Sequence, residues 1–216
     1  MTARRFVKIC GVTTPEDAAM IVAAGADAIG VNLWPGSKRH LTPEAARDVL
    51  AVVPAGVLKV GVFVDAPVDE VERCIDLLEL DRVQLHGDES PAYFDRFDRR
   101  LIRAIRVRDE SSFAAEIGWS PLLWLYDAHV DGYGGGGVPA PWPLIAARAR
   151  RPFLLAGGLT PDNVASAIAE TRPDGVDVAS GVESSARRKD PAKVAAFITA
   201  ARALPGPPDL GPFFKL

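Results

Sequence analysis

Short runs of apolar and β-branched residues recur along the chain, and each run is bounded by residues that favour turns. Runs of this length and composition are typical of buried strands. The segments between them are longer, and their apolar residues recur with the spacing of a helix. The predicted strands are Phe6–Cys10, Ala28–Asn32, Leu58–Phe63, Arg82–His86, Leu101–Val107, Leu122–Asp127, Phe153–Ala156 and Val176–Ser180.

Five of the predicted helices begin with the same local signal. A residue whose side chain can cap a helix is followed directly by proline, which suits the first helical position. The five pairs are Thr14-Pro15, Thr42-Pro43, Ser90-Pro91, Thr160-Pro161 and Asp190-Pro191. Each pair predicts a helix that begins at its proline.

Strands and helices that alternate strictly predict a parallel sheet with right-handed crossovers. Eight such units in 216 residues, without a long linker, favour a single (β/α)8 TIM barrel of the α/β class. An open, doubly wound sheet is the alternative, and it usually has fewer strands. We expect residues 1–204 to form the barrel and residues 205–216, which are rich in proline and glycine, to form a non-helical C-terminal extension.

Composition and charge exclude several classes of function. The net charge of −3 gives no sign of a nucleic-acid-binding surface. Cys10 and Cys74 are the two cysteines, and without a CxxC pair or a His/Cys cluster they predict neither a metal site nor a disulfide. The N-terminus does not resemble a signal peptide, and no apolar stretch is long enough to span a membrane. We therefore expect a soluble, cytoplasmic protein without metal or cofactor.

Chemistry in a barrel of this class is found where the strands end and the βα loops begin. Cys10 ends the first predicted strand and Asp127 the sixth, so a thiol and a carboxyl would face each other across the barrel mouth. Such a pair suits a proton shuttle, in which one group takes a proton from carbon and the other gives a proton to oxygen. Cys10 would need a pKa lowered by nearby positive charge or by the bound substrate. Asp127 would need a pKa raised by burial or by a neighbouring carboxylate. Alternatively, Cys10 is a small apolar residue that packs in the barrel interior, and Asp127 is a turn residue or a helix cap.

Glycine-bearing turns follow the last two predicted strands, at Gly157-Gly158 and at Ser180-Gly181. The loops after the seventh and eighth strands are the usual phosphate-binding position in such barrels, and glycine lets a phosphate approach the backbone closely. Arg39, in the loop after the second strand, is either a solvated charge or a bidentate partner for a substrate carboxylate. The glycine-rich segment 132–137 is either a closing loop or a plain connector.

Several motifs run in the same order as in one known family and cover nearly the whole chain. They are Val7-Lys8-Ile9-Cys10-Gly11, Ser37-Lys38-Arg39, Val60-Gly61-Val62-Phe63-Val64, Gln84-Leu85-His86-Gly87-Asp88-Glu89, Asp127 with its glycine-rich loop, Leu155-Ala156-Gly157-Gly158-Leu159, and Gly175-Val176-Asp177-Val178-Ala179-Ser180-Gly181-Val182-Glu183 followed by Lys189-Asp190. Together they resemble the phosphoribosylanthranilate isomerase family, barrel enzymes of tryptophan biosynthesis. No single motif would be specific.

The resemblance implies an Amadori rearrangement of N-(5-phosphoribosyl)anthranilate to 1-(2-carboxyphenylamino)-1-deoxy-D-ribulose 5-phosphate. It implies Asp127 as the general acid that protonates the furanose ring oxygen, and Cys10 as the general base that takes the C2 proton. Among the substrate-binding residues, Arg39 would bind the anthranilate carboxylate and Asp177 would lie near the amine. The phosphate would lie at the glycine turns, and the substrate-binding set it implies is Arg39, His86, Asp177, Gly157, Gly158, Ser180 and Gly181. A monomer or a homodimer is expected.

Two departures from the family pattern affect loops. The loop after the sixth strand usually carries a hydroxyl residue among its glycines, then lysine, then an Asp-Trp pair. Here Gly134–Gly137 are followed by Val138, and Pro141-Trp142 replaces Asp-Trp, which puts the dynamics of this loop in question. The usual Ser-Pro-Arg is Ser-Lys-Arg, which keeps Arg39.

Other functions on the same fold fit the residues less well. A Schiff-base aldolase needs a lysine that ends a strand, but Lys59 lies at the start of the third predicted strand. Three scattered histidines do not supply the ligands of a metal-dependent epimerase. The remaining alternatives are another phosphosugar isomerase and a non-catalytic barrel that binds a phosphosugar.

Overall fold

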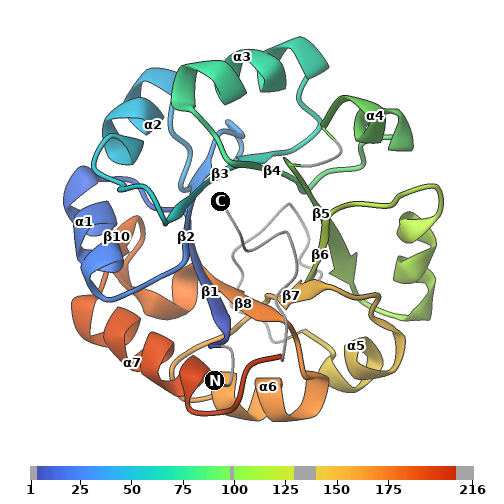
Figure 1. Ribbon diagram of the computed structural model, residues 1–216. Coiled ribbons are helices and arrows are strands. Elements are labelled where there is room, and N and C mark those ends of the chain that lie inside the picture. Colours follow the sequence, from blue (N-terminus) through green and yellow to red (C-terminus); the bar gives the residue numbers. More distant parts are fainter. Residues whose placement is uncertain (1–3, 98–99, 129–139, 208–216) are drawn as a thin grey trace.

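The computed structural model describes residues 4–97, 100–128 and 140–207. Its eight parallel strands pair in chain order from β1 to β8 and close into a barrel, with the helices arranged outside them (Figure 1). The strands are β1 (Phe6–Cys10), β2 (Ala28–Asn32), β3 (Leu58–Phe63), β4 (Arg82–Leu85), β5 (Leu101–Val107), β6 (Leu123–Ala128), β7 (Phe153–Leu155) and β8 (Gly175–Val178). The predicted TIM barrel is confirmed.

Strands β1, β2, β3 and β5 begin and end at the predicted residues, and the other four differ by one or two residues at one or both ends. β4 ends at Leu85, so the prediction that His86 belongs to this strand was wrong. The backbone N–H of His86 still donates a hydrogen bond to the carbonyl of Phe63, at 2.9 Å. His86 therefore lies at the carboxyl end of β4, where a βα loop begins.

The helices follow the strands, with one exception to the prediction. The α-helices are α1 (Pro15–Ala23), α2 (Pro43–Leu50), α3 (Val68–Leu78), α4 (Phe94–Phe97), α5 (Trp142–Arg148), α6 (Val164–Thr171) and α7 (Pro191–Arg202). The segment after β5 is a 3-10 helix, η3 (Glu110–Glu116), where an α-helix was expected. A capping box between Asp109 and Ser112 starts it, and Gly118, at φ 81°, follows it.

Three of the five predicted helix starts are confirmed with their caps. The side chains of Thr14, Thr42 and Asp190 accept hydrogen bonds from backbone N–H groups in the first turns of α1, α2 and α7. After Ser90, a 3-10 turn, η1 (Pro91–Tyr93), precedes α4.

The start predicted at Pro161 was wrong, because α6 begins at Val164. The side chain of Asn163 explains the delay. Its Oδ1 accepts from the backbone N–H of Thr160 at 2.8 Å, and its Nδ2 donates to the carbonyl of Gly158 at 2.9 Å. These two bonds close a turn before the helix and tie it to the end of β7.

Between β8 and α7 the chain forms structure that the apolar pattern did not predict. A short 3-10 turn, η4 (Ser180–Val182), leads into an antiparallel hairpin of β9 (Glu183–Ser185) and β10 (Arg188–Lys189). This hairpin places Glu183 and Lys189 next to each other beside the barrel mouth. The division of the chain at residue 204 stays a prediction, because residues 208–216 lie outside the described part.

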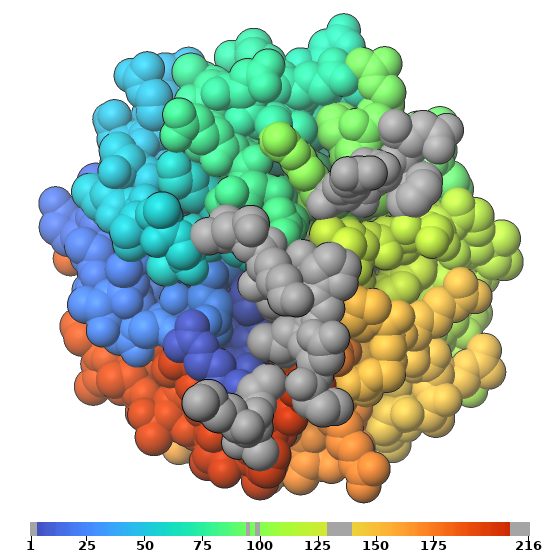
Figure 2. Space-filling view, in the orientation of Figure 1, coloured from blue at the N-terminus to red at the C-terminus, as the bar shows by residue number. Residues whose placement is uncertain are grey.

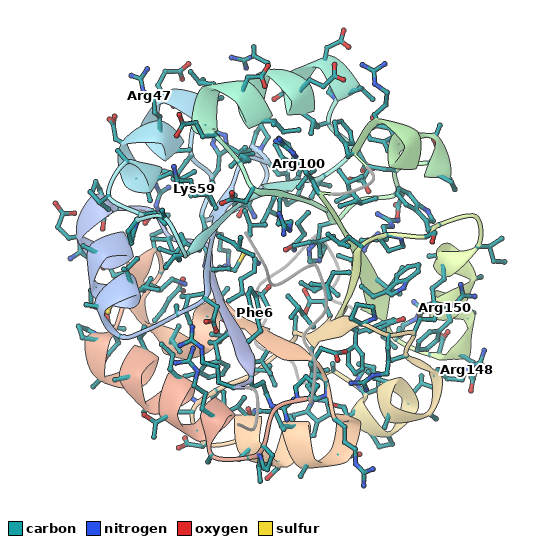
Figure 3. All side chains as sticks on the ribbon, viewed as in Figure 1. Phe6, Arg47, Lys59, Arg100, Arg148 and Arg150 are labelled. Atoms are coloured by element: carbon teal, nitrogen blue, oxygen red, sulfur yellow. The ribbon has the colours of Figure 1, made fainter. Side chains whose placement is uncertain are left out.

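Apolar side chains fill two layers. One layer lies between the strands and the helices. On the face seen in Figure 2, the coloured segments succeed one another around the molecule in chain order. The other layer fills the barrel interior, into which Phe6 points, whereas Arg47 and Arg148 lie at the outer rim (Figure 3). The interior layer consists of Phe6, Ala28, Leu58, Val60, Ile102, Ala104, Leu123, Leu125, Leu154 and Ala156.

Alternation along each strand puts polar residues at one end of this interior. Residues two apart on a strand share a face, so Lys8 and Cys10 follow Phe6 on the inner face of β1. By the same rule Asp127 follows Leu123 and Leu125 on β6. The barrel interior is therefore mainly apolar at the amino ends of its strands, where Arg82 of β4 is a buried polar exception, and polar at their carboxyl ends.

Candidate active site

Lys8, Cys10 and Asp177 form one cluster inside the barrel mouth. Lys8 and Asp177 are register partners on β1 and β8, and Lys8 Nζ lies 3.0 Å from Asp177 Oδ1. Gly30 on β2 leaves room for the cluster, because a Cβ there would lie 2.8 Å from Cys10 Sγ and 3.2 Å from Lys8 Nζ. A thiol, an ammonium and a carboxylate thus share one small space.

The charges of this cluster are set by burial and by each other. Burial disfavours the charged form of the fully buried Lys8, but Asp177 and Cys10 together hold the pKa of Lys8 above its ordinary value. Lys8 is therefore an ammonium at neutral pH. Burial raises the pKa of its partner Asp177, and the charge of Lys8 offsets part of that effect.

Burial raises the pKa of the Cys10 thiol, and the nearby charges of Lys8 and Lys189 offset only part of that effect. The prediction that nearby positive charge lowers this pKa was wrong, because taking a thiolate out of water costs more than Lys8 and Lys189 return. Lowering by the bound substrate stays a prediction. The thiol is thus the major form at neutral pH, and the thiolate is the minor one.

This predicts how Cys10 reacts with iodoacetamide, which attacks only the thiolate. In a Cys74→Ser background, the alkylation rate should rise with pH to a midpoint above that of free cysteine. The measurement is mass spectrometry of the labelled protein across the pH range, with Cys10→Ser as the control for background labelling. A midpoint at or below that of free cysteine would contradict the effect of burial.

Asp127, at the other side of the mouth, is held by a short polar chain. Its Oδ1 accepts a hydrogen bond from the backbone N–H of Ala128 at 2.8 Å. Its Oδ2 lies 3.3 Å from His86 Nε2, and His86 Nδ1 lies 2.9 Å from Gln84 Nε2. Gln84 and His86 lie two residues apart at the carboxyl end of β4. The end of β4 therefore supplies the side chains next to the interior-facing oxygen of Asp127.

Asp177 connects the two clusters. Its carboxylate pairs with Lys8 beside Cys10, and its pKa also responds to the charges of Asp127 and His86. Four of the predicted site residues, Cys10, His86, Asp127 and Asp177, are therefore gathered in one place. The glycine-rich segment that follows Asp127 lies outside the described residues.

The glycine turns at the ends of β7 and β8 pack against each other and against Asp127. Gly157 and Gly158 have positive φ angles of 86° and 62°, which side chains rarely adopt. A Cβ at Gly157 would lie 3.0 Å from Asp127 Oδ1, and one at Gly181 would lie 1.8 Å from the carbonyl oxygen of Leu159. Gly157, Gly158, Ser180 and Gly181 all keep some exposure, so a ligand can reach this backbone.

The contact at Gly181 makes a substitution there costly. Gly181→Ala should lower the free energy of unfolding by about 1–3 kcal/mol, because the new methyl group would push the two turns apart. Ser180→Ala is the control, because it places alanine at the preceding residue of the same turn without adding an atom. Urea unfolding of both variants tests this, and equal losses would contradict the steric argument.

Arg39 reaches the mouth from the loop after β2 and meets Glu183 of β9. Its Nε lies 2.6 Å from Glu183 Oε1 and its Nη2 lies 2.8 Å from Oε2. The Arg39 side chain crosses the chain at Gly11, where a Cβ would lie 2.2 Å from Arg39 Cδ. Arg39 thus lies beside Cys10, but its guanidinium pairs with a carboxylate of the protein itself, that of Glu183.

Three charged residues of the site had no assigned role in the sequence: Lys8, Glu183 and Lys189. Lys8 did carry a signal, because a lysine two residues before Cys10 within an apolar strand faces the same way. Glu183 and Lys189 lie in motifs of the chain, but their meeting depends on the hairpin that the apolar pattern did not show.

The described residues hold no group of three or more His, Cys, Asp or Glu side chains suited to a metal ion. In the same part of the chain, no helix combines the length and the apolar character needed to cross a membrane.

The closed barrel and the polar cluster at the carboxyl ends of its strands define the class: a (β/α)8-barrel enzyme. The model of the N-(5'-phosphoribosyl)anthranilate isomerase family matches residues 7–200. The chain belongs to this family, and it is an isomerase that acts on N-(5'-phosphoribosyl)anthranilate in tryptophan biosynthesis.

Individual relatives agree along nearly their full length. The N-(5'-phosphoribosyl)anthranilate isomerase of Geobacter sp. strain M21 is 48% identical over 200 residues, which are 92% of this chain and 98% of the relative. The crystal structure of phosphoribosyl anthranilate isomerase from Thermotoga maritima has a TM-score of 0.85 and 37% identity, and the match covers 93% of this chain and all of that one. A second crystal structure, 36% identical with a TM-score of 0.80, is of the isomerase in complex with reduced 1-(o-carboxyphenylamino)-1-deoxyribulose 5-phosphate, and the match covers 93% of this chain and all of that one.

Proposed function

We propose that Cys10 and Asp127 are the general base and the general acid of this isomerisation. The observation that carries the proposal is the single polar site at the barrel mouth. In this site Asp177 pairs with Lys8 beside Cys10. The charge of Asp127 also raises the pKa of Asp177. A thiol and a carboxyl on two sides of one space can act on two sides of one sugar.

The first step opens the furanose ring. Asp127 gives its proton to the ring oxygen, the bond between that oxygen and C1 breaks, and the anthranilate nitrogen supplies the electron pair that forms the C=N bond. The product is a protonated Schiff base. The backbone N–H of Ala128 supports this role, because its hydrogen bond to Asp127 Oδ1, at 2.8 Å, holds the carboxyl in one orientation.

The second step moves a proton from carbon. The thiolate of Cys10 takes the C2 proton, and the electrons of that bond form C1=C2 while the nitrogen becomes neutral. The enolamine then loses its hydroxyl proton and gains one at C1, which gives the ketone. The positive charges of Lys8 and Lys189 near Cys10 support the role of base. They lower the pKa of the thiol below the value that burial alone would give it.

Binding of the substrate completes the proposal. Arg39 binds the anthranilate carboxylate, and Asp177 and His86 lie at the amine and the sugar. Gly157, Gly158, Ser180 and Gly181 offer backbone N–H groups to the phosphate. Support comes from the partial exposure of these four residues and from the charge of Arg39 at the same mouth.

The test is a fluorescence assay with N-(5'-phosphoribosyl)anthranilate made in situ. Its anthranilate emission should fall when the protein is added, and the rate should be proportional to protein concentration. No loss of emission from a folded sample would refute the proposed chemistry of this chain.

We also propose that the protein works in the cytoplasm as a monomer or a homodimer. Its two free cysteines and the dimeric isomerase described for Thermotoga maritima support this proposal. Light scattering coupled to size exclusion should give the mass of one or two chains, and a larger mass would contradict it.

A further inference from the structure

Glu183 holds the Arg39 guanidinium along one of its two edges. The guanidinium offers two pairs of parallel N–H groups, one formed by Nε and one Nη, the other by the two Nη atoms. Glu183 accepts from Nε and Nη2, at 2.6 Å and 2.8 Å. Among the described residues, Arg39 makes side-chain hydrogen bonds to Glu183 alone, so its second pair of N–H groups is left for a ligand.

Glu183 is itself held from several sides. Lys189 Nζ lies 3.1 Å from Glu183 Oε1, and it also donates to the carbonyls of Cys10 and Ala179, at 2.7 Å and 2.9 Å. Lys193 Nζ donates to the backbone carbonyl of Glu183 at 2.8 Å. The side chains of Glu183 and Lys189 are 7% and 1% exposed, so this arrangement is a built part of the interior.

The charges of this group leave a surplus that suits an anion. Burial would raise the pKa of Glu183, but the hydrogen bond from Arg39 and the charge of Lys189 hold it below its ordinary value. Glu183 is therefore a carboxylate between Arg39 and Lys189. Burial lowers the pKa of Lys189, and its ion pair with Glu183 offsets part of that effect. With Lys189 protonated, one positive charge is not compensated within the group. All three protons of Lys189 have acceptors, so the cation that can still donate to a ligand is Arg39.

We propose that Glu183 is a positioning residue for substrate binding: by holding one edge of Arg39, it aims the other edge at the carboxylate of the substrate. This inference rests on the proposed role of Arg39 as the carboxylate-binding residue. Gly11 helps to orient Arg39 as well. Because Gly11 has no side chain, the aliphatic part of Arg39 can occupy the space beside it. Glu183 makes no proton transfer, and its effect on the reaction is exerted through Arg39.

The first test separates binding from chemistry. Glu183→Gln keeps the shape of the side chain but removes the charge and one of the two acceptors for Arg39. With N-(5'-phosphoribosyl)anthranilate made in situ, KM should rise about tenfold while kcat changes by less than about threefold. Glu72→Gln is the matched control, because Glu72 pairs with Arg96 at the exposed surface and its loss should change neither constant.

The second test is a double-mutant cycle with Arg39→Ala. If Glu183 acts through Arg39, the double variant should have the same KM as Arg39→Ala alone. Effects that add would overturn the inference, and so would an unchanged KM in Glu183→Gln when Arg39→Ala raises it. An unchanged KM in Arg39→Ala itself would instead refute the proposed role of Arg39, and the inference would end with it.

A third variant covers the case in which Glu183→Gln does not fold, which thermal unfolding would reveal. Glu183→Asp keeps the charge but shortens the side chain by one methylene. The guanidinium of Arg39 should follow the shorter carboxylate and no longer point at the substrate carboxylate. Its KM should rise by about threefold to tenfold in folded protein, again with kcat nearly unchanged. A KM equal to that of the unchanged protein would overturn the inference.

Discussion

Replacing Cys10 with serine should lower kcat by at least about a hundredfold, the usual size of a proton-transfer contribution. A serine hydroxyl fills nearly the same space, but it is far harder to deprotonate than a thiol. Lys8 and Asp177 would keep their 3.0 Å contact, so the site should stay in place while its base is lost. The initial rate of fluorescence loss at saturating substrate measures the effect.

Cys74→Ser is the control for this variant. Cys74 is buried on α3, in the layer between strands and helices, and should not affect the reaction. Retained turnover in Cys10→Ser, with unchanged circular dichroism, would remove Cys10 from the role of base.

Asp127→Asn should also lower kcat by at least about a hundredfold. The amide has nearly the same shape and can still accept the hydrogen bond from the Ala128 N–H, but it has no acidic proton to give to the ring oxygen. The same fluorescence assay measures kcat. The matched control is Asp48→Asn, an exposed residue on α2 for which no change is expected.

A second measurement identifies the step at which Asp127 acts. Reduced 1-(o-carboxyphenylamino)-1-deoxyribulose 5-phosphate is a ligand without a furanose ring, so it needs no proton at a ring oxygen. Its binding should be equal in Asp127→Asn and in the unchanged protein. Much weaker binding of this analogue would assign Asp127 to substrate binding instead of acid catalysis.

Strands β1, β2, β3 and β5 could be predicted to the residue from their short apolar runs. The end of β7 was placed one residue too late, because Ala156 is apolar and buried but lies outside the strand. The 3-10 helix after β5 could not be predicted, because Ser and Ala residues there permit a helix of either kind and Gly118 decides only where it ends. Asn163 likewise competes with Pro161 for the start of α6, and its two side-chain hydrogen bonds prevail.

The residues at the strand ends could be predicted because strand alternation and the barrel class place them at one mouth. Their partners could not. Lys8 and Asp177 are 169 positions apart, and Arg39 and Glu183 are 144 apart, so their pairing depends on barrel closure and on the hairpin after β8. The pKa of Cys10 was mispredicted for a related reason, because the degree of burial at a strand end depends on every strand around it.

The barrel closes between β1 and β8, so charged residues from the two halves of the chain meet at its mouth. Lys8 meets Asp177, His86 meets Asp127, and Arg39 meets Glu183, and in each of these pairs one residue precedes β5 and the other follows it. Neither half of the chain contains both members of any of these three pairs. If the chain were cut between β4 and β5, each fragment should be inactive by itself, and activity should return only when the two fragments reassemble into one ring.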